Sequence, residues 1–489
     1  MKKIVLIVLV IALFAGWTMV KRTNKGDNTV VSDKIDKPKK KKPNVLFILA
    51  DDLGINALNC YGNKLVESPN IDRLFHEGMH FTNGYSNDPT CAPSRASIMT
   101  GQYVPRHKIY RVADRFRQQK NTIPHMRYMP PENNVVKGKG TGLSLDKYII
   151  AEALKDNGYH TAAYGKWHLG HNGLGFTAQG FDKGFEIVGH YNFKTFPEQH
   201  INKPGLYASD VVTENVIKFI KESVKEKEPF FAYVPYYLVH KPLEPKPEYL
   251  KYFKEKLKNN PDVGPDEIKV LAMIKSLDEN VGQLLSVLKE LNIEDETIVA
   301  FVSDNGHYKT ESNIFTQPYR GVKGQTFEGG IRVPYIFRWK GHIAPNSVST
   351  EPIIHVDIYP TFLGLTNSKL NKDIPLDGED ISPILLGKKS KTNRDALVWE
   401  YTNYAGYNKK NKTFRSSWVN VIQMDGFKLT EDVETNKYYL FNLNKDPYET
   451  KEVAAQYPEE VEKLKARLEQ WKKETGYEPP RKNPDYIGK

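Results

Sequence analysis

Cysteine is scarce in this sequence: among its 489 residues only Cys60 and Cys91 are present. Two cysteines cannot build the disulfide framework that stabilises small secreted domains, although an exported protein could pair them with each other. The sequence also has no internal repeat. Hydrophobic residues make up 39% of the chain, which is enough for an ordinary globular core. The length fits one large domain with a smaller one.

The body of the chain also lacks an excess of charge. The formal net charge is +11, but residues 1–42 hold eleven Lys or Arg residues and three Asp, a net charge of +8. Residues 43–489 therefore carry a net charge of only +3. A surface that binds nucleic acid needs a much larger basic excess, so we predict no nucleic-acid partner.

The N-terminal segment is predicted to lie outside the fold. Met1-Lys2-Lys3 precedes an uncharged run at 4–20, which is typical of a signal peptide or a membrane anchor. The run is short for a full span and lacks well-placed small residues for cleavage. We favour an anchor at 1–20 and a basic flexible linker at 21–42. Both alternatives put the body outside the cytoplasm, in the periplasm, at the cell surface or secreted, and only residues 4–20 would touch the membrane.

The stretch Cys91–Gly101 opens with a cysteine, a proline, a serine and an arginine within five residues. Pro93 suits the first turn of a helix, and Gly101 is a typical stop just after one. Cys91 is therefore predicted at the N-terminus of a helix, where free N–H groups favour an anion, and Arg95 adds a positive charge one turn later. Taken alone, the cysteine would more often be a buried structural residue.

Acidic and amide side chains follow two buried strands. The apolar run at 45–50 leads directly into Asp51 and Asp52, and another predicted strand leads into Asp304 and Asn305. In an open α/β sheet, ligands bind beyond the carboxyl ends of the strands. Carboxylate and amide oxygens are ligands that calcium prefers. Each pair alone would fit an ordinary turn, but their shared position favours a metal site.

Cationic side chains are found in similar positions. The strand predicted at 159–164 leads into Lys166 and His168, which lie two apart on an extended segment and can reach the same anion. His240 follows another buried strand, and Lys323 lies in a glycine-containing turn. Each could equally be a solvated lysine or a structural histidine.

Two of these motifs resemble the signatures of the formylglycine-dependent sulfatases, arylsulfatase-like enzymes of the alkaline-phosphatase superfamily. The first is Cys-Ala-Pro-Ser-Arg at 91–95 with Thr-Gly at 100–101, and the second is the stretch 158–168. The resemblance covers most of residues 44–475. It implies that a maturation enzyme oxidises Cys91 to formylglycine (3-oxoalanine). One hydroxyl of the aldehyde hydrate would attack sulfur, and the other would expel the product.

The resemblance also implies a role for each site residue. Arg95 orients the hydrate, Lys166 and Lys323 bind the sulfate, and His168 takes the proton from the second hydroxyl. His240 contacts the sulfate or the leaving oxygen, and either His240 or Lys323 protonates that oxygen. At position 322 this chain has valine where the family often has glycine. The implied calcium ligands are Asp51, Asp52, Asp304, Asn305 and the modified Cys91.

The expected fold is α/β, with a large, mainly parallel sheet sandwiched by helices (alkaline-phosphatase-like) and a small C-terminal antiparallel-sheet subdomain. Residues 43–389 would form the catalytic sulfatase domain, 390–475 the subdomain and 476–489 a polar tail. The basic, irregular segment 103–140 is predicted to form a wall of the substrate cleft.

The resemblance implies a sulfuric ester hydrolase, and we expect it to release sulfate from a sulfated carbohydrate with the help of a bound calcium ion. An arylsulfatase acting on small aryl esters stays open. A phosphohydrolase of the same superfamily would use Ser or Thr and two transition metals, which the intact Cys-x-Pro-Ser-Arg motif argues against. A catalytically inactive glycan-binding protein would have lost one of the site residues, and none is lost. The sequence does not reveal the sugar, the position of its sulfate or whether chain ends are cleaved.

Overall fold

The computed structural model of the chain describes residues 41–112, 123–171, 173–198, 205–370 and 372–487. The predicted anchor at 1–20 and nearly all of the predicted linker lie outside these residues. No helix within the described residues is long and apolar enough to span a bilayer. The described residues from Lys42 onward belong to one compact unit.

A nine-stranded sheet forms the centre of this unit. In spatial order its strands are β13 (Ser347–Ser349), β2 (Met79–Phe81), β12 (Tyr335–Arg338), β11 (Thr297–Ser303), β1 (Asn44–Ala50), β10 (Phe230–Pro235), β7 (His160–Gly165), β8 (Lys183–Val188) and β9 (Lys194–Phe196). The strands from β11 to β8 run parallel, and β12 and β9 pair antiparallel at their two sides. All residues of β1 are buried, as expected for a parallel strand whose two faces are both covered.

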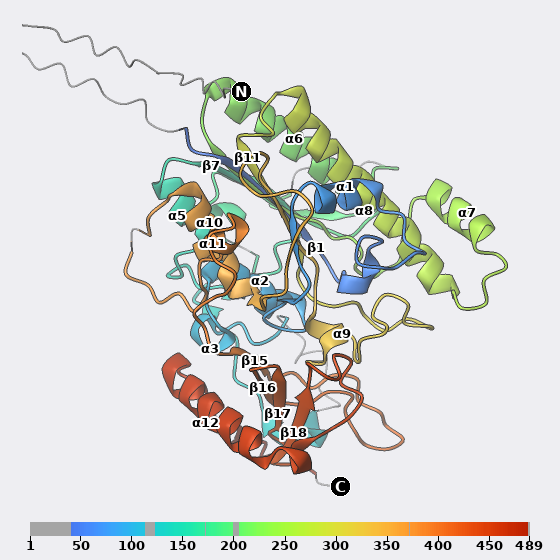
Figure 1. The fold of residues 1–489 in the computed structure, drawn as a ribbon, viewed down its shortest axis with the longest axis vertical. Helices are drawn as coiled ribbons and strands as arrows, with labels where there is room; N and C mark the ends of the chain where they lie inside the picture. The colour runs from blue at the N-terminus through green and yellow to red at the C-terminus, as the bar shows by residue number, and fades with distance from the viewer. Residues whose placement is uncertain (1–40, 113–122, 172, 199–204, 371, 488–489) are drawn as a thin grey trace, which may run out of the picture. The chain divides into compact units, whose positions relative to one another are not determined.

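Helices cover both faces of the sheet (Figure 1). One face packs against α1 (Pro69–His76), α6 (Ala208–Glu226) and α8 (Pro265–Glu290), and the other against α2 (Cys91–Thr100), α5 (Ile150–Asp156) and α10 (Ile358–Thr366). Alternate residues of β1 divide between the two cores: Leu46 and Ile48 pack in the first, Phe47 and Leu49 in the second. The predicted sheet sandwiched by helices is confirmed.

A small antiparallel sheet follows in the C-terminal part of the chain, red in Figure 1. Its strands are β15 (Leu397–Tyr401), β16 (Val419–Met424), β17 (Phe427–Asp432) and β18 (Lys437–Asn442). Helix α12 (Pro458–Thr475) packs on this sheet and adds Leu464, Leu468 and Trp471 to a third hydrophobic core. The C-terminal antiparallel-sheet subdomain predicted from the sequence is therefore present.

The predicted polar tail at 476–489 contains a short paired strand. β19 (Arg481–Lys482) pairs antiparallel with β4 (Tyr128–Met129), so this segment is held by backbone hydrogen bonds that polar composition does not reveal. The other α-helices and short strands of the described residues are α3 (Val104–His107), α7 (Pro247–Lys256), α9 (Glu328–Ile331), α11 (Ser382–Leu385), β3 (Gly84–Tyr85), β5 (Val135–Val136), β6 (Gly140–Thr141) and β14 (Ile353–Ile354).

Candidate active site

Four neighbouring parallel strands, β7, β10, β1 and β11, end at the same edge of the central sheet. Asp51 follows β1 directly, Asp304 follows β11 and Lys166 follows β7, while His240 comes a few residues after β10. Residues that are far apart in the sequence therefore meet at the edge where parallel sheets bind their ligands.

Helix α2 begins at Cys91 and ends at Gly101, whose left-handed backbone has a φ of 65°. Every residue of this helix is buried. The Cys91 Sγ atom lies 3.4 Å from Asp51 Oδ1 and 3.7 Å from Asp52 Oδ1. The Nζ atom of Lys323 lies 3.3 Å from the same sulfur. The helix start predicted from the motif thus lies among both carboxylates and a cation.

Arg95 holds three parts of the site together and is fully buried. Its Nε and Nη2 atoms each lie 2.8 Å from Asp304 Oδ2, and its Nη1 donates to the carbonyl of Lys166 at 2.6 Å. Although burial alone would lower the pKa of Arg95, Asp304 and Asp51 raise it. Arg95 therefore stays charged and fixes the carboxylate at the end of β11.

Two lysines pair with the carboxylates that follow β1. Lys166 Nζ lies 2.5 Å from Asp51 Oδ2, and Lys323 Nζ lies 2.5 Å from Asp52 Oδ1. The backbone N–H of Lys323 donates to the carbonyl of His307 at 2.8 Å, which fixes its loop just beyond β11. Burial would lower the pKa of both lysines, but the carboxylates hold it above the ordinary value. Both are therefore protonated and able to neutralise an anion.

The two adjacent carboxyl groups differ in their pKa. Burial, followed by repulsion from Asp304, raises the pKa of Asp51 to about 7. Burial would also raise the pKa of Asp52, but the charge of Lys323 holds it below its ordinary value. The Asp52 carboxylate is thus ionised, whereas the charge of Asp51 depends on a compensating cation.

The Cys91 thiol is a poor nucleophile as encoded. Burial raises its pKa, although Lys166 and Lys323 act in the opposite direction. Only a thiolate attacks readily, and this thiol stays protonated at neutral pH. The site therefore favours nucleophilic chemistry from a group other than the encoded thiol.

Two histidines flank the cluster. His240 Nδ1 donates to the Lys241 carbonyl at 2.5 Å, and its Nε2 lies 3.9 Å from Asp52 Oδ2. Burial and the charge of Lys166 lower the pKa of His240 to about 3. His168 has a left-handed φ of 65°, and its buried Nδ1 has no hydrogen-bond partner within the described residues. Burial and Lys166 also hold its pKa well below the ordinary value, so both imidazoles are neutral.

The acidic side of the cluster fits a divalent cation. Asp51, Asp52, Cys91 and His240 each offer one atom, and these atoms lie within 4.8 Å of one another. Asn305 Nδ2 donates to Asp52 Oδ1 at 2.7 Å, which leaves the buried Asn305 Oδ1 without a partner among the residues described. Carboxylate and amide oxygens are hard ligands that suit calcium. The residues present therefore fit the calcium ion implied by the resemblance.

Both carboxylate oxygens of Asp304 already accept hydrogen bonds from the protein. Its Oδ2 accepts from Arg95, and its Oδ1 accepts from the backbone N–H of Asp52 at 3.1 Å. A carboxylate oxygen has a second lone pair, so these bonds leave Asp304 able to bind a cation as well.

Several buried residues that the sequence did not single out position the site. His355 Nδ1 lies 2.7 Å from Ser94 Oγ, and its Nε2 lies 3.0 Å from the carbonyl oxygen of Ser303. Glu186 on β8 accepts the backbone N–H groups of residues 167–168 at 3.0 Å each. Ser94 belongs to the first motif and could have been assigned. Glu186 gives no local signal, because only the order of strands brings β8 beside β7.

The loop that carries Lys323 is connected to the C-terminal subdomain by a buried ion cluster. Lys428 Nζ on β17 lies 3.0 Å from Glu328 Oε1 and 3.0 Å from Glu449 Oε1, and all three side chains are fully buried. The backbone N–H of Glu328 donates to Glu449 Oε2 at 2.7 Å. The cluster therefore joins β17 to α9, which follows closely after Lys323.

Lys428→Met is expected to destabilise the fold by about 3–5 kcal/mol, because two buried carboxylates lose their shared cation. Urea denaturation followed by tryptophan fluorescence measures this change. Adding Glu449→Gln should restore part of the stability, since one uncompensated charge is removed. The control is Lys463→Met, which breaks an exposed pair with Asp425. An equal loss in this control would contradict the role of burial.

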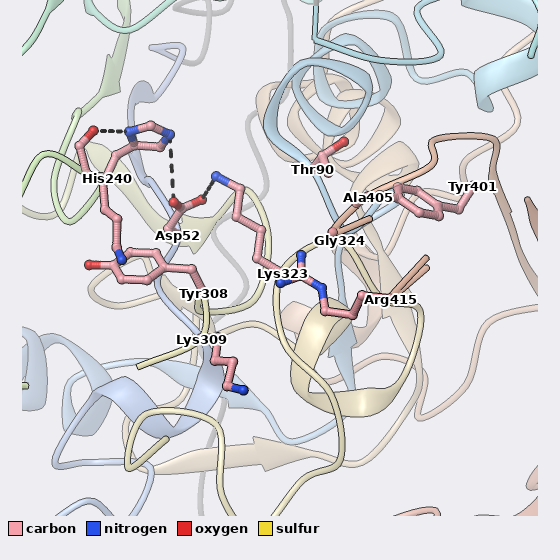
Figure 2. Close-up of a pocket in the computed structure, with 12 residues that line it drawn as sticks. Asp52, Thr90, His240, Tyr308, Lys309, Lys323, Gly324, Tyr401, Ala405 and Arg415 are labelled. Atoms are coloured by element: carbon pink, nitrogen blue, oxygen red, sulfur yellow. Dashed lines mark hydrogen bonds and ion pairs between the residues drawn. The ribbon is translucent and has the colours of Figure 1, made fainter. Parts of the chain in front are cut away.

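A cleft of about 370 Å³ opens onto the cluster. Asp52, His240 and Lys323 line it, and Figure 2 shows the imidazole of His240 and the ammonium group of Lys323 directed at the Asp52 carboxylate. Its outer wall includes Arg415 from the subdomain. None of the described residues of 103–140 lines the cleft, and 113–122 lie outside the described residues, so the cleft wall at 103–140 stays a prediction. An irregular composition identifies a loop, but it does not tell which side of the fold the loop covers.

Known proteins share both parts of this chain. Residues 43–368 match the family model Sulfatase, and residues 322–474 match the model N-sulphoglucosamine sulphohydrolase, C-terminal. A Sulfatase from Formosa agariphila is 31% identical, and the alignment covers 88% of this chain and 87% of that protein. The N-acetylgalactosamine-6-sulfatase of Canis lupus familiaris is 28% identical, with 83% and 81% covered.

The similarity extends to three dimensions. The crystal structure of Ps i-CgsB superposes with a TM-score of 0.73 at 26% identity, covering 88% of this chain and 92% of that chain. The segment matched by the Sulfatase model, 43–368, contains every site residue predicted from the sequence. The chain belongs to the sulfatase family of sulfuric ester hydrolases and has the alkaline-phosphatase-like fold.

Proposed function

We propose that the protein releases sulfate from a sulfated carbohydrate, using a formylglycine formed from Cys91 and a bound calcium ion. The observation that carries the proposal is the setting of Cys91. Its buried, protonated thiol begins a helix and contacts two carboxylates and a lysine. These surroundings suit a charged, hydroxyl-bearing reaction centre better than a thiol.

The formylglycine hydrate would supply a hydroxyl nucleophile, and calcium would supply positive charge for the sulfate oxygens. Asp51, Asp52, Asp304 and Asn305 would hold the cation. Lys166 and Lys323 neutralise the remaining negative charge of the sulfate. Arg95 keeps the carboxylate of Asp304 in place by its two contacts with Oδ2.

Lys323 is assigned to protonating the leaving oxygen. It stays protonated beside Asp52 and lines the cleft. His240, with a pKa of about 3, is neutral in the substrate-free protein, and its one proton is directed from Nδ1 to the Lys241 carbonyl. His240 is therefore assigned to orienting the substrate. His168, which is also neutral, is assigned as the base.

His168→Ala is expected to lower the steady rate of sulfate release by about 10²–10⁴-fold, as for the loss of a general base. The first equivalent of alcohol should still appear rapidly, because the ester bond breaks before this base acts. Stopped-flow measurements with a chromogenic aryl sulfate separate the two phases. The control is His160→Ala, at the opposite end of β7. Loss of the rapid phase would place His168 in the first half of the reaction instead.

A carbohydrate substrate is supported by the cleft and by the relatives. The volume of about 370 Å³ suits a ligand of the size of a small saccharide. The Ulvan-active sulfatase of Formosa agariphila is 30% identical, with 75% of this chain and 69% of that protein covered. Ps i-CgsB has been solved in complex with k-i-k-neocarrahexaose. We propose that the N-terminal run delivers the protein outside the cytoplasm, where such glycans are encountered.

Sulfate release from a panel of monosulfated sugars, an aryl sulfate and the matching phosphate esters tests this function. We expect the highest kcat/KM for a sulfated sugar. Preferential turnover of the phosphate esters would favour a phosphohydrolase. Binding of sulfated sugars without turnover, in protein produced together with a formylglycine-generating enzyme, would favour an inactive glycan-binding protein.

A further inference from the structure

Three cationic side chains line the outer part of the cleft, beyond the catalytic cluster: Lys241, Lys309 and Arg415. None of them forms an ion pair with another of the described residues. The cleft lining contains one carboxylate, Asp52, and Lys323 already pairs with it at 2.5 Å. The outer part of the cleft therefore carries positive charge that no carboxylate among the described residues neutralises.

Arg415 lies against two glycines, and at one of them, Gly406, a larger residue would displace it. A Cβ atom at Gly324 would lie 3.5 Å from Arg415 Nη2, and one at Gly406 would lie 2.9 Å from Arg415 Cβ. Both glycines have left-handed backbones, with φ values of 79° and 66°. Figure 2 shows Arg415 extending from the wall opposite His240 toward Lys323. Its guanidinium group thus lies beside the residue that follows the sulfate-binding lysine.

The segment that carries Arg415 is held by regular contacts. Antiparallel bridges join Ala405 to Ser416 and Asn408 to Thr413. The backbone N–H of Arg415 donates to the Ala405 carbonyl at 2.9 Å. The ring of Tyr407 stacks on the imidazole ring of His125, with 4.5 Å between the ring centroids. The backbone that carries Arg415 is therefore fixed in a hairpin, and its exposed side chain extends from this hairpin into the cleft.

We infer that the substrate carries a second anionic group, a sulfate or a carboxylate, next to the sulfate ester that is cleaved, and that Arg415 binds it. Arg415 suits this task because a guanidinium group can donate two parallel hydrogen bonds to a planar or tetrahedral anion. Lys309 and Lys241 add positive charge from the neighbouring wall. This inference rests on the proposed function, and it narrows the substrate to a saccharide with at least two negative charges.

The second anionic group of the substrate is either a sulfate or a carboxylate, and the experiment distinguishes between the two. It starts from a monosulfated sugar that the wild-type protein hydrolyses. That sugar is compared with the same sugar bearing a second sulfate, and with a disaccharide that joins it to a uronic acid. We expect one of the doubly charged compounds to have a kcat/KM about 10–100-fold higher than the monosulfated sugar, mainly through a lower KM. Equal values for all three would overturn the inference.

Arg415→Gln should remove most of this preference. The kcat/KM of the doubly charged compound should fall about 10–100-fold more than that of the monosulfated sugar. The matched control is Lys410→Gln, which removes a positive charge from the same hairpin outside the cleft and should leave the preference intact. An equal fall for both compounds would mean that Arg415 only supports the Lys323 loop, and would overturn the inference.

Binding to Cys91→Ala protein separates this inference from the proposed function. Calorimetry on this protein needs no turnover. If it binds the doubly charged compound more tightly than the singly charged one, and Arg415→Gln abolishes the difference, the second-anion site stands even where no sulfate is released. If sulfate is released but the two compounds bind equally, the inference fails and the proposed function stands.

Discussion

Cys91→Ala is expected to lose sulfate release almost completely, with kcat/KM lower by about 10⁴–10⁶-fold, as when an enzyme loses its nucleophile. The physical reason is that the lysines and carboxylates around position 91 can bind and orient a sulfate ester but cannot attack it. Asp51 and Asp52 hold the pKa of Lys166 and Lys323 above the ordinary value, so neither amine is a free nucleophile. The rate of sulfate release from the best substrate of the panel, measured at saturating calcium, tests this expectation.

Cys60→Ala provides the matched control, because it removes the second cysteine of the chain at a half-buried position next to Asp72 and away from the cluster. It should leave sulfate release near the wild-type value. Mass spectrometry of the wild-type peptide containing Cys91 should show the thiol replaced by an aldehyde. An unmodified thiol at position 91 in fully active protein would contradict the proposed chemistry.

Several of the site residues proposed from the sequence could be placed because they directly follow predicted strands. A buried parallel strand has a recognisable apolar run, and the polar residues at its carboxyl end must lie at one edge of the sheet. This reasoning predicted Asp51, Lys166 and Asp304 at one edge, and in the structure Arg95 contacts both the Asp304 carboxylate and the Lys166 carbonyl. The helix of Cys91 was predictable from Pro93 for the same local reason.

The second layer of the site was not predictable in this way. Glu186 and His355 act on the backbone or side chains of site residues from elements that are adjacent only in three dimensions. Lys428 could not be assigned from the sequence either, because a lysine on a β-strand is expected to be exposed to solvent. Its burial depends on two glutamates from distant segments.

The outer cleft shows the same limit more clearly. Sequence reasoning assigned its wall to 103–140, whereas Arg415 comes from a hairpin between β15 and β16. A hairpin of polar and aromatic residues gives no sign of which cleft it faces. The proposed selection of substrate by Arg415 thus depends on a hairpin whose position local sequence does not specify. The proposed chemistry lies mainly at strand ends, which local sequence does predict.

Asp52→Asn is expected to abolish turnover by weakening the binding of calcium. Asparagine keeps the shape of the side chain but removes one negative charge next to the cation. Calcium affinity should fall by at least about 100-fold, because even the outer partners of metal ligands contribute about 10–100-fold. Asp52 is a better choice than Asp304, whose loss would also leave the buried guanidinium of Arg95 without its main partner.

Thermal unfolding detects this effect without any turnover. Chelator-treated wild-type protein should gain about 2.7 kcal/mol of stability when calcium is added at 100 times its Kd, and its melting temperature should rise accordingly. Asp52→Asn should show little rise at the same concentration, and metal analysis should find less than one bound calcium. Asp425→Asn, an exposed change that leaves the site intact, should behave like the wild type. Asp52 lies next to Cys91 and His240, and removing the charge of a ligating carboxylate weakens the binding of its cation. If Asp52→Asn binds calcium as tightly as the wild type does, the ion therefore lies elsewhere.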